Sequence, residues 1–214
     1  VQTCALPIFF IAGFVEREVA LKTLIEIIEN DRKSENPLFH ENFTIGSYGC
    51  FPGCIWNGGR VIFGEINGIG KVKEIFDWYE NHNIALQLVF TNNRLEPHDI
   101  YDRYGNAILD EAMRHTNVEF KICSPYLEEH ILNKYPNAKL IKSLKPIKSV
   151  SDDIIDDDYF KYTGIVLPLR YTYEMDKIKK LTYEINKSSI FVYFLADFPF
   201  SLLFVMFPLF FSKY

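Results

Sequence analysis

Two cysteines, Cys50 and Cys54, lie four positions apart in a glycine-rich stretch that covers residues 47–60. Thiolates at such a spacing can bind a metal ion, so the pair is a candidate for metal chemistry. An iron–sulfur cluster of the radical-enzyme type needs a third cysteine from the same loop, and Asn57 occupies that position. Zinc would need four soft ligands, whereas His40 is the only histidine nearby in the sequence. The pair is therefore a weak metal candidate.

The second half of this stretch, Asn57-Gly58-Gly59-Arg60, has the residue types of a turn that holds an anion. Consecutive glycines let backbone N–H groups approach an anionic group closely, and an arginine can bind it through two hydrogen bonds. The pattern matches neither a Walker loop nor a dinucleotide fingerprint. A tight turn in which Arg60 pairs with an acidic neighbour and Trp56 packs in the core is the alternative, and both interpretations stay open.

These candidates must be positioned by a regular alternation of strands and helices. Apolar runs and period-two patterns predict strands, and apolar residues at helical spacing predict helices. The predicted strands cover residues 9–13, 43–49, 84–93, 118–124, 138–143, 164–169 and 189–194. The predicted helices cover residues 14–30, 70–83, 96–115, 125–135 and 174–186, with Pro97 in the first turn of the third.

Such an alternation with short connections implies parallel strands joined by right-handed crossovers. We predict an α/β fold. One form of it is an incomplete (β/α) barrel, incomplete because a complete eightfold barrel usually takes about 250 residues and this chain has 214. An open doubly wound parallel sheet is the alternative. In both architectures a ligand binds beyond the carboxyl ends of the strands.

Polar side chains follow the predicted strands at that edge. Thr91 and Asn92 follow the strand that begins at residue 84, and Ser124 ends the strand that begins at residue 118. Each could orient a ligand, and each is also a residue type that favours turns and helix caps. We therefore predict a ligand-binding rim formed by Asn57, Gly58, Gly59, Arg60, Thr91, Asn92 and Ser124, with its catalytic residues unknown.

The two ends of the chain differ from the predicted α/β domain over residues 9–189. Residues 1–8, VQTCALPI, match the translation of a common sequencing-library adapter, and we interpret them as an artefact. The hydrophobic tail, residues 190–214, contains a run from Ile190 to Phe211 with Asp197 as its one charge. That length suits a membrane span, but prolines interrupt it, and a frame-shifted sequence would look similar.

The composition of the chain argues against a nucleic-acid-binding protein and against a disulfide-rich secreted protein. The net charge of −5 gives no global attraction to nucleic acid. Four cysteines in 214 residues are too few for a disulfide framework, so we expect reduced thiols and a cytoplasmic location. A membrane partner is expected only if the tail is native.

Three segments carry a resemblance: GCFPGCIWNGGR, LVFTNNRLEPHDIYDRYGNAILDEA and ICSPYLEEHILNKYPNAKLIKS. They resemble a group of uncharacterised proteins from anaerobic, mostly gut, bacteria. More distantly, the order of motifs resembles the barrel half of the collagenase-like peptidase family. That resemblance implies a TIM-barrel-like fold and, in a full-length protein, an iron–sulfur cluster held by C-terminal cysteines and linked to RNA modification or ubiquinone hydroxylation. No cysteine follows Cys123, so this chain does not support the cluster.

Three functions are consistent with these features. The first is an enzyme that binds a small polar or anionic ligand at the carboxyl-end rim of a partial barrel. The second is a non-catalytic binding or scaffold module, in which residues 47–60 form only a rigid turn. The third is a relative of the collagenase-like peptidase family, of peptidase or iron–sulfur RNA-modification type, truncated before its cysteine cluster.

Overall fold

A computed structural model gives the fold, and it describes residues 8–39, 44–58, 66–143, 161–166, 176, 191–193 and 203–206. Its helices are α1 (Glu18–Arg32), α2 (Ile69–Asn81), the short 3₁₀ helix η1 (Asp99–Tyr101), α3 (Arg103–Ala112) and α4 (Pro125–Lys134). Its strands are β1 (Ile8–Ala12), β2 (Thr44–Gly49), β3 (Ala85–Phe90), β4 (Val118–Ile122), β5 (Leu140–Ser143), β6 (Gly164–Val166), β7 (Phe191–Tyr193) and β8 (Leu203–Met206).

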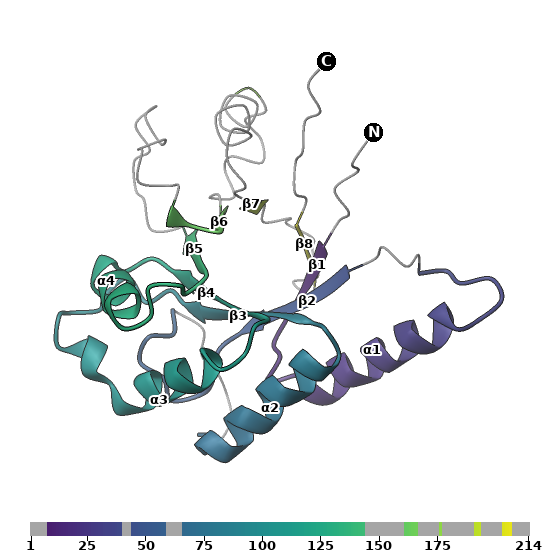
Figure 1. Cartoon of the computed structure of the whole chain (residues 1–214), viewed down its shortest axis with the longest axis horizontal. Coiled ribbons are helices and arrows are strands. Elements are labelled where there is room, and N and C mark those ends of the chain that lie inside the picture. Colours follow the sequence, from purple (N-terminus) through teal and green to yellow (C-terminus); the bar gives the residue numbers. More distant parts are fainter. Residues whose placement is uncertain are drawn as a thin grey trace.

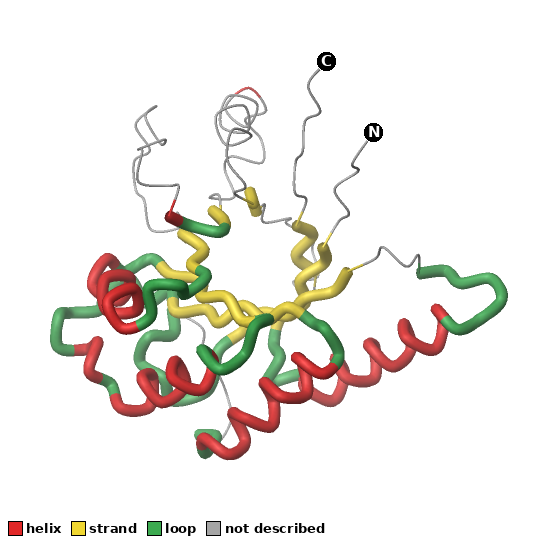
Figure 2. The backbone as a smooth tube through the Cα atoms, in the orientation of Figure 1, coloured by secondary structure: helices red, strands yellow, loops and turns green. Residues whose placement is uncertain are grey.

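The strands form one curled sheet in the order β7-β6-β5-β4-β3-β2-β1-β8. Every neighbouring pair from β1 to β7 is parallel, and β8 pairs with β1 in the antiparallel direction. Figure 1 shows α1 to α4 together on the outer, convex side of the curl, and Figure 2 shows the strands curving around an open concave side. This arrangement is an incomplete (β/α) barrel.

The alternative prediction of an open doubly wound sheet is wrong. In that fold the strand order reverses at a switch point and helices cover both faces. Here β1 to β7 follow one another in sequence order, and α1 to α4 cover one face (Figure 1). Sequential parallel pairing with helices on one side is the arrangement of a barrel wall.

Where the structure describes them, the predicted elements are confirmed with one clear correction, and β8 was not predicted. We predicted a single helix over residues 96–115, but η1 comes first and α3 begins at Arg103. The reason is Asp102, whose backbone is not helical and whose carboxylate accepts a hydrogen bond from Gly105 N at 2.8 Å. An aspartate in this role is an N-cap, so it starts a new helix. Of the helix predicted over residues 174–186, only Asp176 is described, in helical conformation.

The two ends are described in part. Residues 1–7 lie outside the described residues, and Ile8 already belongs to β1. Within the predicted hydrophobic tail, β7 confirms the strand predicted at 189–194, and β8 pairs with β1. Among the residues that the structure describes, none of the helices combines the length and apolar character of a membrane span.

The main hydrophobic core lies between the convex face of the sheet and the helices. On β3 and β4 alternate residues enter it, as a period-two pattern requires: Leu86, Leu88, Phe90, Val118, Phe120 and Ile122. Trp56, from the loop after β2, is 0% exposed and packs edge-on against Phe90, with 5.3 Å between ring centroids. A Cβ on Gly105 of α3 would lie 2.8–2.9 Å from the Trp56 ring. Only a glycine at this position lets α3 approach the indole.

This packing predicts opposite effects for two helical glycines. Gly105→Ala should destabilise the protein by about 1–3 kcal/mol, because the added methyl group overpacks a filled core. Gly70→Ala in α2 is the matched control, since a methyl group added there would enter open space. It should be neutral or stabilising by up to about 1 kcal/mol, from helix propensity. Urea unfolding of the two variants measures both effects, and a Gly105→Ala protein as stable as the parent would contradict the packing described.

Candidate functional site

The loop after β2 carries the two cysteines, and the structure buries both. Cys50 is 1% exposed and Cys54 is 5% exposed, and both are free thiols. Burial raises the pKa of Cys54 to about 12, so its sulfur carries a proton at neutral pH. Metal ligands are thiolates, and this environment disfavours the thiolate. The two cysteines belong to the packing of the loop.

These thiols also do not fit an iron–sulfur cluster. Asn57, at the position of the third cysteine, donates its side-chain N–H to Phe51 O at 2.7 Å and so closes the loop. Burial raises the pKa of the remaining described cysteine, Cys123, to about 11. In the part of the chain that the structure describes, no group of three His, Cys, Asp or Glu side chains could hold a metal ion.

The predicted anion-binding turn is described only in its first half, because Gly59 and Arg60 lie outside the described residues. A Cβ on Gly58 would lie 2.3 Å from both Thr91 O and Thr91 Oγ1. The glycine is therefore needed for close backbone contact with the end of β3. Asn57 Oδ1 is buried, and no described residue donates a hydrogen bond to it, so it is an unsatisfied acceptor at the rim.

Asn92, after β3, fixes the same loop from the other side. Its side-chain N–H donates to Ile55 O at 2.8 Å, and its backbone N–H donates to Trp56 O at 3.1 Å. Its Oδ1 accepts a hydrogen bond from Arg94 N at 3.0 Å. These three bonds engage the side-chain N–H, the side-chain oxygen and the backbone N–H of Asn92, and two of them attach residues 55–56 to the end of β3. The structure thus gives Asn92 a structural role at the rim.

Ser124 begins α4. Its backbone is extended, its carbonyl accepts from Glu128 N at 3.0 Å, and Leu127 N lies 3.5 Å from its Oγ. It is 4% exposed, and Pro125 follows at the first helical position, as is common. Of the predicted rim residues, the structure brings Asn57, Gly58, Thr91 and Asn92 together around one loop and places Ser124 at a helix start.

A second group of polar side chains lies on the concave face of the sheet. Residues that alternate with those of the main core point to this side, where a smaller apolar cluster is formed by Phe10, Ala12, Tyr48, Val89, Ile141 and Val166. Within this cluster lie three polar residues, Gln87 of β3 and Glu119 and Lys121 of β4. We call these three residues the concave polar cluster.

Strand register places these residues side by side. Tyr48 of β2 pairs with Gln87, and Gln87 pairs with Glu119. The Gln87 side-chain N–H donates to Glu119 Oε2 at 3.0 Å. Lys121 lies one pleat closer to the carboxyl ends of the strands, beside Val89, and its ammonium group lies 4.9 Å from the centroid of the Tyr48 ring. Tyr48 of β2 thus lies beside the concave polar cluster, and the four residues together form a polar row across three consecutive strands.

Two properties of this row are costly in a folded interior. Gln87 is 0% exposed, and within the described part of the chain its Oε1 has no hydrogen-bond partner. Burial raises the pKa of Glu119 above its ordinary value of 4.5, although the hydrogen bond from Gln87 and the charges of Lys139 and Lys121 oppose that shift. An unsatisfied buried acceptor costs about 1–3 kcal/mol. Groups kept at such a cost are frequent at sites that bind or transform a ligand.

The arrangement can perform three chemical tasks. A carboxyl group with a raised pKa holds its proton more readily and can exchange it with a ligand. The Lys121 ammonium attracts an anionic group, and Gln87 Oε1 can accept a hydrogen bond from a ligand N–H or O–H. A small polar molecule with an anionic group and a hydrogen-bond donor would satisfy all three.

The sequence-based prediction considered only residues that follow the strands, so it missed this cluster. The signal was present in VEFKI, where Glu119 and Lys121 alternate with three apolar residues. Two charged residues at i and i+2 of a buried parallel strand must share one face. That face is concave here.

No protein-family model and no curated protein sequence matches the chain. The resemblance to the collagenase-like peptidase family therefore stays a prediction, and the candidate function rests on the fold and the side-chain geometry.

The role of Asn92 is testable by stability. Asn92→Ala should destabilise the protein by about 0.5–1.5 kcal/mol, because it removes the hydrogen bonds to the Ile55 carbonyl and from Arg94 N. Asn93→Ala is the matched control at the adjacent, exposed position and should change stability by less than about 0.5 kcal/mol. Equal stability of the two variants in urea unfolding would assign Asn92 to ligand binding instead.

A second prediction concerns Glu119 and pH. Because its pKa is higher in the folded state, its protonated form favours folding fully below its ordinary pKa of 4.5, and that contribution is lost as the pH rises through the folded pKa. Glu119→Gln removes the buried charge and retains an acceptor for Gln87. The variant should melt higher than the parent at pH 7–8, with a difference that shrinks toward pH 4.5. A Glu119→Gln variant that melts lower at pH 7 would contradict the raised pKa.

Proposed function

We propose that this protein is an enzyme that binds a small polar or anionic ligand inside the partial barrel, toward the carboxyl ends of its strands. The observation that carries the proposal is the buried Gln87 Oε1, which has no hydrogen-bond partner among the described residues, beside a carboxyl group, Glu119, whose pKa is raised. Neither feature stabilises the folded protein in the absence of a ligand. A ligand that donates a hydrogen bond to Gln87 would offset the cost.

In this proposal each residue of the concave polar cluster has a distinct role. Gln87 orients the ligand through its Oε1. Glu119 accepts or donates the proton, since its raised pKa brings the two protonation states closer together in energy at neutral pH. Lys121, one pleat nearer the carboxyl ends of the strands, attracts an anionic group on the ligand.

The location of this cluster supports the proposal. Ligands of (β/α) barrels bind at the carboxyl-end face of the strands, and the polar row leads from the middle of β3 toward that face. The predicted rim group Asn57 contributes a further unsatisfied acceptor there. We also propose a cytoplasmic location, because the described cysteines Cys50, Cys54 and Cys123 form no disulfide, as in a reducing compartment.

The resemblance to the collagenase-like peptidase family is consistent with this proposal, because the resembled half of that family is a barrel. We do not extend the proposal to peptidase or iron–sulfur chemistry. Cys50 and Cys54 are buried and Cys123 is partly buried, and desolvation raises the pKa of Cys54 and of Cys123, so these thiols do not support a cluster.

A thermal-shift screen of the full chain against small carboxylates, phosphate esters and amino acids tests the proposal. A ligand at 100 times its Kd stabilises by about 2.7 kcal/mol, which corresponds to roughly 5 °C or more for a chain of this size. Gln87→Leu and Lys121→Met should abolish the shift. Lys73→Met on the exposed face of α2 is the control and should retain it.

Two outcomes would count against an enzyme site on the concave face. One is the absence of any stabilising compound, which would favour the non-catalytic scaffold alternative. The other is a shift that Gln87→Leu and Lys121→Met both retain, which would place the ligand elsewhere on the molecule.

A further inference from the structure

The chain contains the dipeptide Asn-Gly twice, as Asn57-Gly58 and as Asn67-Gly68. An asparagine followed by glycine is especially prone to spontaneous deamidation, because glycine has no Cβ to hinder the approach of its backbone nitrogen to the side-chain amide. The first dipeptide belongs to the glycine-rich stretch after β2, and the second lies directly before α2. Their environments in the folded protein are opposite.

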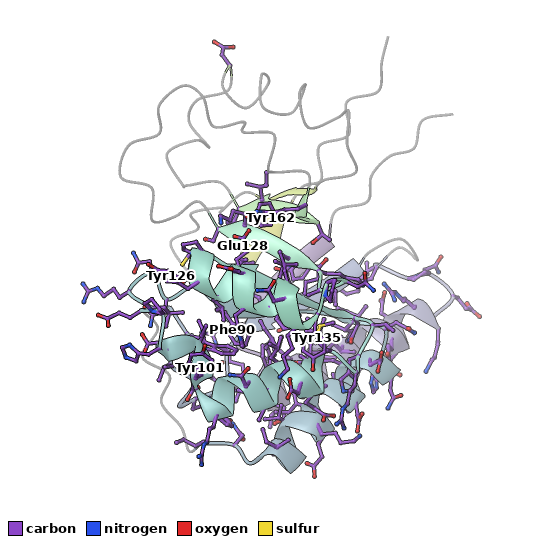
Figure 3. The ribbon with its side chains drawn as sticks, turned by 60° about the vertical axis from the view of Figure 1, so that its left-hand side comes forward. Phe90, Tyr101, Tyr126, Glu128, Tyr135 and Tyr162 are labelled. Carbon is purple, nitrogen blue, oxygen red and sulfur yellow. The ribbon has the colours of Figure 1, made fainter. Side chains whose placement is uncertain are left out.

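The structure fixes the first dipeptide in place. Asn57 donates its side-chain N–H to Phe51 O at 2.7 Å, and a Cβ on Gly58 would lie 2.3 Å from the backbone just after β3. The preceding Trp56 packs against Phe90, which lies among the interior side chains in Figure 3. The Asn57 side chain would have to leave Phe51 O before its amide carbon could meet the Gly58 nitrogen.

The second dipeptide is open to reaction. Asn67 is partly exposed, Gly68 is exposed, and a Cβ on Gly68 would have no heavy atom within 4 Å. Within the described part of the chain, the Asn67 side-chain amide forms no hydrogen bond. The Gly68 N–H forms none either, because it is one of the donors that the start of a helix leaves unpaired. Both reacting groups are thus accessible.

Two further contacts make the Gly68 nitrogen reactive. Deamidation begins when this nitrogen loses its proton, and amide resonance then spreads the negative charge onto the carbonyl oxygen of Asn67. Tyr104 Oη donates a hydrogen bond to that oxygen at 2.7 Å and so stabilises the charge. Gly68 is also the N-cap of α2, where the helix dipole favours a negative charge.

We propose that Asn67 is a site of spontaneous deamidation in the folded protein and that Asn57 is protected from this reaction. The Gly68 nitrogen attacks Asn67 Cγ, a C–N bond forms, and the Cγ–Nδ2 bond breaks as ammonia leaves with a proton from water. A second water molecule then opens the resulting succinimide ring at one of its two carbonyl groups. The product is an aspartate or an isoaspartate at position 67.

The modification changes the charge at the start of α2. The product carries a carboxylate, whereas the first turn of α2 has no acidic residue. Lys71 of that turn pairs with Glu18 of α1 at 3.2 Å, so the new charge is added to the helix start that contacts α1. This site is independent of the proposed concave-face function, since it uses neither Gln87 nor Glu119.

Incubation of the folded full chain at neutral pH tests the proposal, with tryptic peptides quantified by mass spectrometry over time. Trypsin cuts after Arg60 and Lys71, so Asn67 is the one asparagine of its peptide and Asn57 falls in another. We expect Asn67 to deamidate about tenfold or more faster than Asn57, because Asn57 reacts only after its loop opens. In urea, where the chain is unfolded, the two rates should become similar.

Gly68→Ala should slow the deamidation of Asn67 by about tenfold or more, because the added Cβ hinders the attack. The variant should fold, since Gly68 has a φ of −63° and open space around it. Gly70→Ala is the matched control, because it adds the same methyl group to open space in α2, and it should leave the rate unchanged. An unmodified Asn67 in the folded chain would overturn the proposal. Equal rates at Asn57 and Asn67 in the folded chain, or a difference that persists in urea, would do so as well.

Discussion

The alternation of side chains between the two faces of β3 and β4 is the constraint on which the rest of the structure depends. Leu86, Leu88 and Phe90 enter the core beneath the helices, so Gln87 and Val89 must face the concave side. The same rule directs Glu119 and Lys121 of β4 inward. A shift of one residue in register would bury both charges under α3 and α4 and expose the apolar set. Packing on the convex face therefore fixes the chemistry of the concave face.

The loop after β2 depends on the same core. Trp56 packs against Phe90 and Gly105 and donates its indole N–H to Asp99 O at 2.9 Å, which joins the loop to η1. Asn92 holds the loop backbone at residues 55 and 56. The described part of the glycine-rich stretch thus covers the core at the carboxyl ends of the strands, and Trp56 and Asn92 hold it there. Its cysteines, which first suggested a metal, contribute buried thiols to that packing.

Local patterns were enough to predict the α/β class and its parallel strands, because strands and helices differ in the period of their apolar residues and in their end signals. They did not distinguish a barrel from an open sheet, and the family resemblance favoured the barrel. Ser124 followed by Pro125 marked the start of α4 correctly. The predicted start of α3 was wrong because Pro97 and Asp102 both signal a helix start, and we chose the first. The hydrogen bond from Trp56 to Asp99 O, which lies at the break between η1 and α3, is a tertiary contact that no local pattern shows. The partner of Asn92, the Ile55 carbonyl, lies 37 residues away in sequence, so no local pattern could reveal its role.

Our central claim is that the concave face holds a half-buried, titratable carboxyl group, that of Glu119, positioned for a ligand. The most direct measurement is the titration of the Glu119 carboxyl carbon by ¹³C NMR in the full chain, assigned with Glu119→Gln. We predict a midpoint above the ordinary value of 4.5, because burial disfavours the charged form. A midpoint at or below 4.5 would mean that water or the neighbouring lysines stabilise the carboxylate, and it would contradict the claim.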